Sequence, residues 1–227
     1  MKNIGMIVAV EIASVLERYG TPHGEESIWG FKIFRYDMAG CRLYVLNSGV
    51  GELAAAAAAQ LLIDHYDASL IVNFGVVGGL TEDMGEMRTC VVEKLVHYDF
   101  DLSEIDPVEP GRYPGYDSVY IPMSPELVEK AVEIAPELKR VVCASADKFV
   151  GNEQAKRALH ERYGADICEM EAAGIALTCR RCSVPCLAIK TVSDGVDGGA
   201  DAFYAQIRRS SEICLEITDR IIREDIL

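Results

Sequence analysis

Short apolar runs alternate with helical segments along the chain, and this alternation constrains the fold more than any other feature. Runs at residues 4–10, 69–80 and 185–194 are rich in Ile, Val and Leu. Such runs are typical of strands that are buried on both faces of a sheet. Segments that fit helices lie between and after them, including residues 52–66, 152–164 and 200–224. Strands that alternate with helices predict an α/β fold.

One hairpin interrupts the alternation. Residues 31–48 alternate around an Ala39-Gly40 turn, which is typical of two antiparallel strands. The sequence therefore predicts a mixed, twisted central sheet flanked by helices. Residues 98–120 are dense in Pro, Gly and Tyr and predict a long surface loop. Because the chain contains no repeat and no linker, we expect a single domain over residues 1–227.

Composition excludes several classes of partner. The net charge of −14 argues against binding to nucleic acid or to an anionic membrane, because both require basic patches. The apolar run at the N-terminus is too short for a membrane span and lacks a cleavage-site pattern. Cys179, Cys182 and Cys186 form the one cysteine cluster, but no fourth ligand stands in a recognisable motif. We expect a cytoplasmic protein with no metal and no cofactor.

Ligands of open α/β sheets bind at the carboxyl ends of the strands. The segments after the predicted strands carry small residues at 47–51 and 73–79, and acids at positions 11, 169, 171 and 194. The four histidines are scattered, and no serine lies in a nucleophile elbow. Neither glycine stretch matches a phosphate-binding loop or a dinucleotide fingerprint. The strand ends thus offer small residues, acids and one aromatic side chain.

The segment "ICEMEAAGIAL" (residues 167–177) puts two glutamates at the edge of an apolar region, where carboxylates need partners. Together with "NSGVG", "NFGVVGGL", "SADKFV" and "VSDG", its order and spacing resemble the nucleoside phosphorylase superfamily. Within that superfamily, the chain is most similar to the 5'-methylthioadenosine/S-adenosylhomocysteine nucleosidases. The resemblance covers almost the whole chain.

This resemblance implies an enzyme, an N-glycosyl hydrolase that releases adenine from 5'-substituted thioadenosines. Asp194 would be the acid that protonates the purine N7, and burial at a strand end makes that role feasible by raising its pKa. The alternative for Asp194 is a carboxylate that caps the loop before Gly195. The alternative for Glu171 is a first-turn acid that complements the helix dipole.

The resemblance also implies how the substrate is held. Glu171 would bind the ribose hydroxyls, Met170 would pack beneath the ribose, and Phe149 would stack on the purine unless it is a core residue. Backbone groups of Phe149 and Val150 would meet the adenine edge. The other implied binding residues are Glu169, Ser193, Gly75, Val76 and Phe203, with Phe203 over the 5'-substituent.

The nucleophile separates hydrolases from phosphorylases. A phosphate co-substrate needs a cradle of arginines. Superfamily phosphorylases carry an arginine just before the glycine turn, where this chain has Asn73 and Phe74. The nearest arginines, Arg35 and Arg88, are expected in strands. Water is therefore the predicted nucleophile, and a purine nucleoside phosphorylase is the alternative.

The group that activates water is where the chain departs from the family. Nucleosidases carry a glutamate shortly after the first strand, and an ungapped alignment puts Ala13 there, with Glu11 two residues earlier. Either Glu11 is the base, or the chain is a catalytically impaired nucleoside-binding protein. Val76 and Lys190 replace a serine and an arginine of the family, so the substrate can differ as well. The expected partners are a small-molecule nucleoside and a second copy of the chain in a homodimer.

Overall fold

The computed structural model describes residues 1–224 and contains the expected strands and helices. The strands are β1 (Lys2–Val8), β2 (Gly24–Ile28), β3 (Phe31–Asp37), β4 (Cys41–Asn47), β5 (Leu70–Gly79), β6 (Thr89–His97), β7 (Ile121–Pro122), β8 (Lys139–Ser145), β9 (Ile167–Glu169) and β10 (Cys186–Asp194). The helices are α1 (Ile12–Tyr19), α2 (Glu52–Tyr66), α3 (Pro125–Ile134), α4 (Glu153–Tyr163), α5 (Ala172–Cys182) and α6 (Ala200–Arg223).

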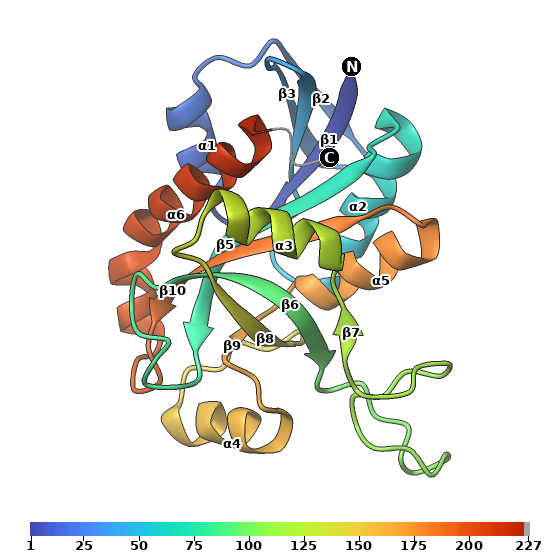
Figure 1. Cartoon of the computed structure of the whole chain (residues 1–227), viewed down its shortest axis with the longest axis vertical. Helices are drawn as coiled ribbons and strands as arrows, with labels where there is room; N and C mark the ends of the chain where they lie inside the picture. Colours follow the sequence, from blue (N-terminus) through green and yellow to red (C-terminus); the bar gives the residue numbers. More distant parts are fainter. Residues whose placement is uncertain (225–227) are drawn as a thin grey trace.

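The strands form one mixed sheet in the order β10-β6-β8-β9-β5-β1-β4-β3-β2, with β7 paired to β6 (Figure 1). β1 runs parallel to β4 and β5, whereas β2, β3 and β4 form an antiparallel meander. The hairpin predicted over residues 31–48 is confirmed as β3 and β4. The prediction lacks β2, because its sequence GEESI has no apolar alternation.

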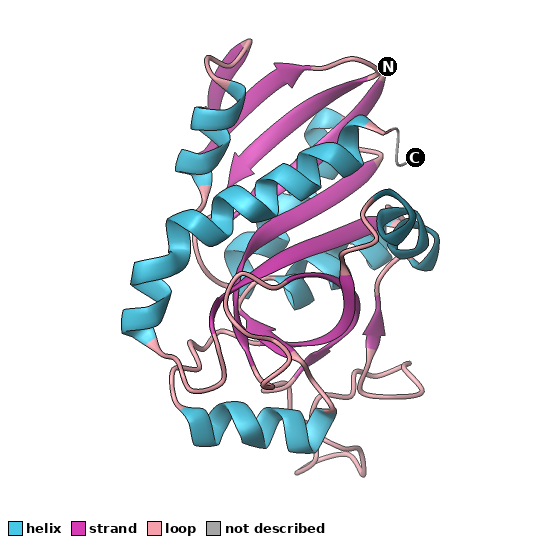
Figure 2. Ribbon diagram, turned by 60° about the vertical axis from the view of Figure 1, so that its left-hand side comes forward, coloured by secondary structure: helices cyan, strands magenta, loops and turns pink. Residues whose placement is uncertain are grey.

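The long strand β5 belongs to two parts of the sheet. Residues 70–73 pair with β1 on one edge, residues 71–78 pair with β10 on the other edge, and Gly78 and Gly79 pair with β9. β10 also pairs with β6, and β6 leads through β8 back to β9. These strands therefore close into a ring, which is visible in Figure 2. The ring brings the ends of β5, β8, β9 and β10 together.

Helices cover both faces of the sheet. α2 and α5 pack against each other on one face, while α6 packs on β5 and β10 of the other face with α1 beside it (Figure 1). Short side chains allow the close approach of α2, in which Ala55, Ala58 and Ala59 are buried. Within residues 1–224, no helix is long and apolar enough to cross a bilayer. The predicted α/β fold with a mixed sheet and flanking helices is confirmed.

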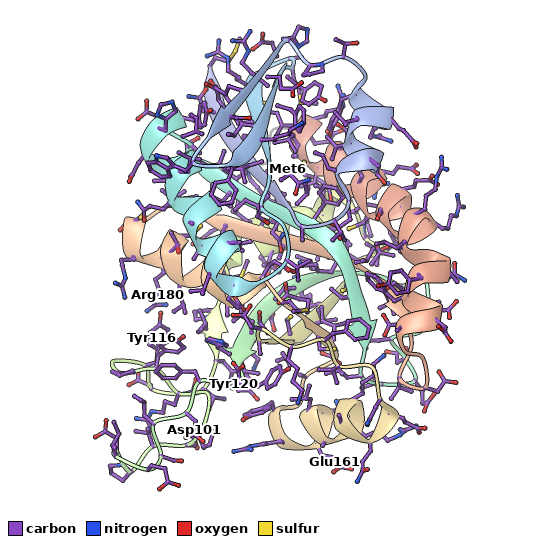
Figure 3. The ribbon with its side chains drawn as sticks, turned by 180° about the vertical axis from the view of Figure 1, so that it is seen from behind. Met6, Asp101, Tyr116, Tyr120, Glu161 and Arg180 are labelled. Atoms are coloured by element: carbon purple, nitrogen blue, oxygen red, sulfur yellow. The ribbon has the colours of Figure 1, made fainter. Side chains whose placement is uncertain are left out.

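Residues 98–120 form the predicted loop, which extends from the sheet between β6 and β7 (Figure 3). Aromatic side chains order it locally, since Phe100 stacks on Tyr113 with ring centroids 3.8 Å apart. The Arg180 guanidinium of α5 lies 4.7 Å from the ring centroid of Tyr116, which fastens the loop to the body of the protein.

Candidate active site

A cavity of about 570 Å³ opens where the segments after β1, β5, β8, β9 and β10 meet. Most residues singled out by the sequence lie in its wall: Glu11, Val76, Phe149, Val150, Glu169, Met170, Glu171, Asp194 and Phe203. Ser193 and Gly75 lie behind the wall, where Ser193 donates a hydrogen bond to Asp194 (2.8 Å) and Gly75 packs against Glu11. The closed ring of strands explains how these separate segments meet.

Glu11 lies at the N-terminus of α1 and is 4 % exposed. Its Oε1 accepts the amide of Val76 at 2.9 Å, and its Oε2 accepts the amide of Val10 at 3.0 Å. A Cβ on Gly75 would lie 2.8 Å from Oε1, so a glycine leaves the room that Glu11 needs beside β5. Ala13 is exposed on α1. The carboxylate that reaches the cavity from this segment is therefore at position 11 and not at position 13.

Glu171 and Glu169 have different partners. Glu171 precedes the first residue of α5 as its N-cap residue, and its Oε1 accepts the amide of Gly51 at 3.0 Å. Burial, reinforced by the charge of Glu169, raises the pKa of Glu171 to about 7. Glu169 accepts the amides of Glu171 (3.0 Å) and Ala172 (2.9 Å) and pairs with Lys190 at 3.2 Å. Glu169 thus holds the start of α5, and both Glu169 and Glu171 lie in the cavity wall.

Lys190 is a buried cation in this carboxylate cluster, with 1 % of its surface exposed. Burial alone would lower its pKa, but the negative charges of Glu169 and Glu171 outweigh burial and raise it. The lysine that replaces the family's arginine therefore stays charged. Its role in the structure is to compensate the two glutamates that the sequence places beside a core.

Glu52 is a further buried acid that sequence reasoning missed. It begins α2, and it contacts the Ser145 hydroxyl and the amide of Gly174. Burial and the charge of Glu169 raise the pKa of Glu52 to about 8. The sequence offers no signal for this role, because a glutamate in the first turn of a helix is ordinary on a surface.

Asp194 ends β10 and is 1 % exposed. Its Oδ2 lies 2.5 Å from the ammonium of Lys156, a residue of α4 that is fully buried. Burial raises the pKa of Asp194, although the Lys156 charge and the Ser193 hydroxyl act in the opposite direction. Sequence reasoning also missed Lys156. Its position could have indicated burial, because it lies three residues before Leu159 and seven before Tyr163, on the inward face of an amphipathic helix.

Apolar side chains form the outer part of the cavity. Phe149 is 47 % exposed and lies edge-to-face with Phe203, with ring centroids 5.7 Å apart. Tyr204 continues the aromatic wall at 5.3 Å from Phe203. Val10, Val50 and Ile207 complete this part of the lining. Phe149 is thus a cavity residue, and its alternative as a core residue is wrong.

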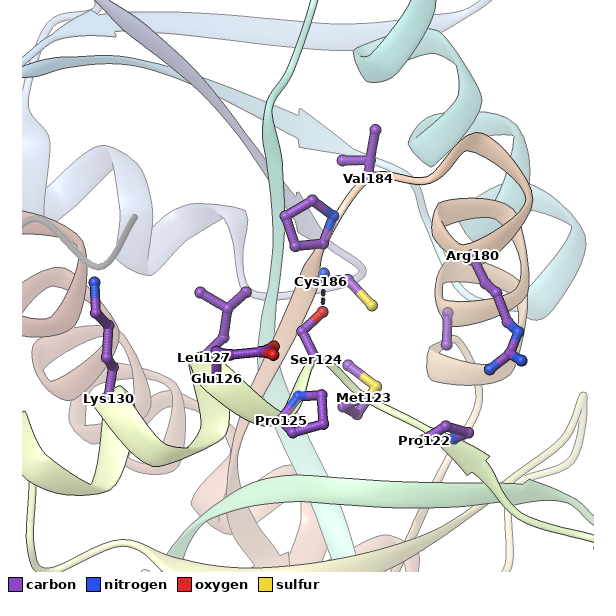
Figure 4. A pocket seen from close by; sticks show the side chains of 12 residues that line it. Pro122, Met123, Ser124, Pro125, Glu126, Leu127, Lys130, Arg180, Val184 and Cys186 are labelled. Carbon is purple, nitrogen blue, oxygen red and sulfur yellow. Dashed lines mark hydrogen bonds between the residues drawn. The ribbon is translucent and has the colours of Figure 1, made fainter.

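A second cavity, of about 510 Å³, lies between the start of α3 and the end of α5 (Figure 4). Its wall is mainly apolar, and the hydroxyl of Ser124 there accepts the amide of Cys186 at 3.0 Å. None of the proposed catalytic and substrate-binding residues lines it, and within residues 1–224 its wall has no pair of buried carboxylates. The first cavity is therefore the candidate active site.

The chain is similar in sequence to proteins of known family. The family model described as the phosphorylase superfamily matches residues 4–223. An aminodeoxyfutalosine nucleosidase of Helicobacter pylori is 27% identical, with 99% of each chain covered. A 5'-methylthioadenosine/S-adenosylhomocysteine nucleosidase of Tolumonas auensis is 29% identical over 84% of this chain and 85% of the relative.

The fold is also similar to those of solved structures. The native structure of futalosine hydrolase of Helicobacter pylori matches with a TM-score of 0.92 and 28% identity over 98% of both chains. The 5'-methylthioadenosine/S-adenosylhomocysteine nucleosidase of the same organism, with butyl-thio-DADMe-Immucillin-A, matches with a TM-score of 0.93 and 27% identity over 99% of both chains. These relatives are named as nucleosidases or hydrolases, so the predicted enzyme class, an N-glycosyl hydrolase, is confirmed at the level of the family. With a family model that spans nearly its whole length, the chain belongs to the phosphorylase superfamily.

Proposed function

We propose that this protein is a nucleosidase that hydrolyses the N-glycosidic bond of 5'-substituted thioadenosines, such as methylthioadenosine and S-adenosylhomocysteine, and releases adenine. The observation that carries the proposal is a pair of buried carboxyls, Glu11 and Asp194, in the wall of one cavity. Glu11 contacts β5 at Val76, and Asp194 packs beside Gly78 of the same strand. Residues two apart on a strand are separated by roughly 7 Å along it, so the two carboxyls meet β5 at neighbouring points of one cavity.

Asp194 is proposed as the general acid. Departure of adenine requires a proton on the base, because the purine anion is a poor leaving group. A buried carboxyl can hold that proton near neutral pH, and burial raises the pKa of Asp194 in this direction. The proton passes from Asp194 to N7 while the C1'–N9 electron pair moves onto the purine. Ser193, which donates to Asp194 Oδ1, orients the carboxyl.

Glu11 is proposed as the general base. Its two oxygens each accept one backbone amide, so each keeps a further lone pair for a water molecule. Water attacks C1' and gives its proton to Glu11. Since Glu11 lies in the cavity wall and Ala13 is exposed, we favour an active enzyme over an impaired binding protein. Gly75 and Val76 serve this role by accommodating and holding the carboxylate.

The remaining site residues are proposed to bind the substrate. Glu171 accepts hydrogen bonds from the ribose hydroxyls and stabilises the oxocarbenium-like sugar, with Met170 as the apolar floor. Phe149 and Val150 hold the purine. Phe203 covers the 5'-substituent, and Glu169 acts indirectly by fixing the start of α5 and pairing with Lys190.

Water is the proposed nucleophile because the cavity lacks an anion cradle. Among residues 1–224, no arginine lines it, and its one lysine, Lys148, is exposed. Arg35 lies on β3 and donates instead to the carbonyl of His23. A phosphate dianion would meet several carboxylates and few cations in this wall, which disfavours a phosphorylase.

A second candidate substrate is aminodeoxyfutalosine, for which two relatives from Helicobacter pylori are named. The adenine, ribose and catalytic groups would be used in the same way, and only the 5'-substituent would differ. The apolar outer wall with Val10, Val50 and Tyr204 is compatible with a bulky 5'-group.

The proposal also covers the organisation of the protein. We propose that residues 1–227 form one domain and that the protein is a cytoplasmic homodimer.

The direct test is release of adenine from methylthioadenosine, S-adenosylhomocysteine and aminodeoxyfutalosine, each with and without phosphate. We expect free ribosyl product at the same rate in both conditions, and the ratio of kcat/KM values ranks the three substrates. If adenine is released only in the presence of phosphate and the product is a sugar 1-phosphate, the protein is a phosphorylase and not a hydrolase. If none of the three substrates yields adenine, the protein is a nucleoside-binding protein without catalysis. Light scattering coupled to size exclusion tests the homodimer.

A further inference from the structure

Lys156 is a fully buried cation whose partners all belong to one place. Its ammonium lies 2.5 Å from Asp194 Oδ2 and donates to the carbonyls of Gly195 (2.7 Å) and Gly198 (3.1 Å). These carbonyls belong to the turn that links β10 to α6. Lys156 comes from α4, directly after the segment that carries Phe149 and Val150. One side chain thus joins the acid, the turn after it and the wall proposed for the purine.

Two glycines leave room for the ion pair of Lys156 and Asp194. A Cβ on Gly78 would lie 3.3 Å from Asp194 Oδ2 and 3.5 Å from Lys156 Cε, and one on Gly198 would lie 3.2 Å from Asp194 Cβ. Larger residues would therefore crowd the pair. A buried ion pair is costly to desolvate and adds little stability compared with apolar packing, so stability alone explains it poorly. This points to a role in the chemistry at Asp194.

We propose that Lys156 is a positioning residue for the proposed acid Asp194: it holds the carboxyl and the 195–198 turn in place and stabilises the carboxylate that remains when the proton has moved to the purine. The inference rests on the proposed function, in which Asp194 protonates N7. Before transfer, the neutral carboxyl lies beside a cation. After transfer, Asp194 is an anion paired with Lys156, and adenine leaves neutral. The attraction between the two groups thus develops during the reaction, which is where an interaction accelerates it.

Other groups that face Asp194 do not supply this charge. The Cys168 thiol of β9 lies across Gly78, and the Ser193 hydroxyl donates to Oδ1. Glu86, in the turn between β5 and β6, acts on Asp194 with a negative charge. Asp197 lies in the turn beside Gly195. Lys148, on the rim, is exposed and therefore screened. Lys156 is the buried cation in contact with the acid.

The test is the pH dependence of kcat/KM in Lys156→Met, which removes the charge and keeps most of the stem. An opposite charge in contact lowers a carboxyl pKa by about 1–3 units, so its loss moves the alkaline limb that reports protonated Asp194 upward by a similar amount. A weaker acid also transfers its proton more slowly, and we expect kcat to fall by about 10- to 100-fold. Lys156→Arg keeps the charge and is expected to keep the limb. Arg157→Met, at the next and exposed position of α4, is the matched control and should resemble the parent.

A double-mutant cycle separates this role from a structural one. Asp194→Asn removes the acid, and Lys156→Met should cost no further activity in that background, because Lys156 acts through Asp194. Full activity of Asp194→Asn would refute the proposed function itself. If Asp194→Asn is inactive but Lys156→Met keeps the parent's pH limb, or if the two losses add, the inference about Lys156 is wrong. If Lys156→Met fails to fold, Lys156→Gln replaces it in the same cycle. If both variants misfold while Lys156→Arg shows the parent's pH profile, Lys156 has a structural role only.

Discussion

The hydroxyl of Ser145 lies within hydrogen-bond distance of Glu52 Oε1 and of Glu169 Oε1, and it also accepts the amide of Ala173. A hydroxyl donates one proton and accepts at two lone pairs. One of the two carboxyls must therefore donate to Ser145. Glu169 is paired with Lys190, whereas burial and Glu169 raise the pKa of Glu52 to about 8. Glu52 is thus the neutral acid of this network at pH 7.

Replacement of Glu52 by glutamine is expected to stabilise the protein at alkaline pH. The pKa of Glu52 rises from 4.5 to about 8 on folding, so folding favours its neutral form, and stability is lost as pH rises between these values. Glutamine still donates to Ser145 and accepts from Gly174, and it cannot ionise. Thermal unfolding should give Glu52→Gln a higher Tm than the parent near pH 8, and the difference should shrink toward about pH 5.

The first-turn glutamate of α3 is the control for this prediction. Glu126 is exposed, so Glu126→Gln should follow the parent's Tm at every pH. A Tm difference for Glu52→Gln that does not change with pH would mean that Glu52 is ionised throughout and that the proton lies elsewhere in the network.

The ambiguity between Glu11 and Ala13 leads to a second prediction at this scale. Glu11→Gln removes the proposed base and keeps an acceptor for only one of the two amides, Val76 or Val10, and turnover should fall by about 10²- to 10⁴-fold. Ala13→Glu adds a carboxylate to an exposed position, so it should not restore the activity of Glu11→Gln. Steady-state kinetics of the parent, of Glu11→Gln and of the double variant with Glu11→Gln and Ala13→Glu checks this. Rescue by Ala13→Glu would show that α1 can rotate into the cavity.

The sequence predicts residues of the candidate site to the extent that each follows a strand of the sheet. Glu11 and Asp194 lie at the carboxyl ends of β1 and β10, which both run parallel to β5, so these ends meet at one edge. Glu171 also follows a strand, but β9 runs antiparallel to β5, and the closed ring brings Glu171 to the same place. Lys156 and Glu52 do not lie at a strand end. Lys156 is 38 positions from Asp194, and Glu52 is 93 positions from Ser145, and only the closed ring brings these partners together. Single-residue patterns contain no information about such pairs.

At the scale of elements, strands with Ile- and Val-rich runs are predictable, whereas their pairing is not. The run at residues 69–80 gives β5 its existence and length. Nothing in it indicates that β1 pairs at residues 70–73 and β9 at Gly78 and Gly79, while β10 pairs along residues 71–78. Likewise, the three residues of β9 form a strand because β5 and β8 flank them.

The contact between α2 and α5 gives a prediction that opposes helix propensity. Gly→Ala in an exposed helix stabilises by about 1 kcal/mol. A Cβ on Gly174 would overlap the Glu52 carbonyl oxygen, and overpacking of that kind costs about 1–3 kcal/mol. We therefore expect Gly174→Ala to lower the free energy of unfolding in urea, whereas Thr178→Ala on the same helix should change it by a few tenths of a kcal/mol. A stabilised Gly174→Ala would mean that the two helices separate easily.

Over the whole molecule, charge is distributed unevenly between surface and site. The chain has 36 acidic and 22 basic residues, yet two of its lysines, Lys156 and Lys190, are buried against carboxylates of the cavity. Glu11, Glu52, Glu169, Glu171 and Asp194 are buried as well, so the excess of acids over bases on the outer surface is smaller than that of the whole chain. Surface charges repel each other across solvent and are screened by salt, whereas the buried pairs are screened much less.

Salt is therefore expected to stabilise the fold at neutral pH. With a net charge of −14, self-repulsion of the native surface should weaken as the ionic strength rises, and the Debye length falls from roughly 30 Å at 0.01 M to about 3 Å at 1 M. Tm at pH 7.5 should increase with sodium chloride over this range. Near the isoelectric point of about 4.7 the repulsion is small, so salt should have little effect there. A falling Tm at neutral pH would show that ion pairs such as Arg140–Glu129 and Arg18–Asp219 outweigh the general repulsion.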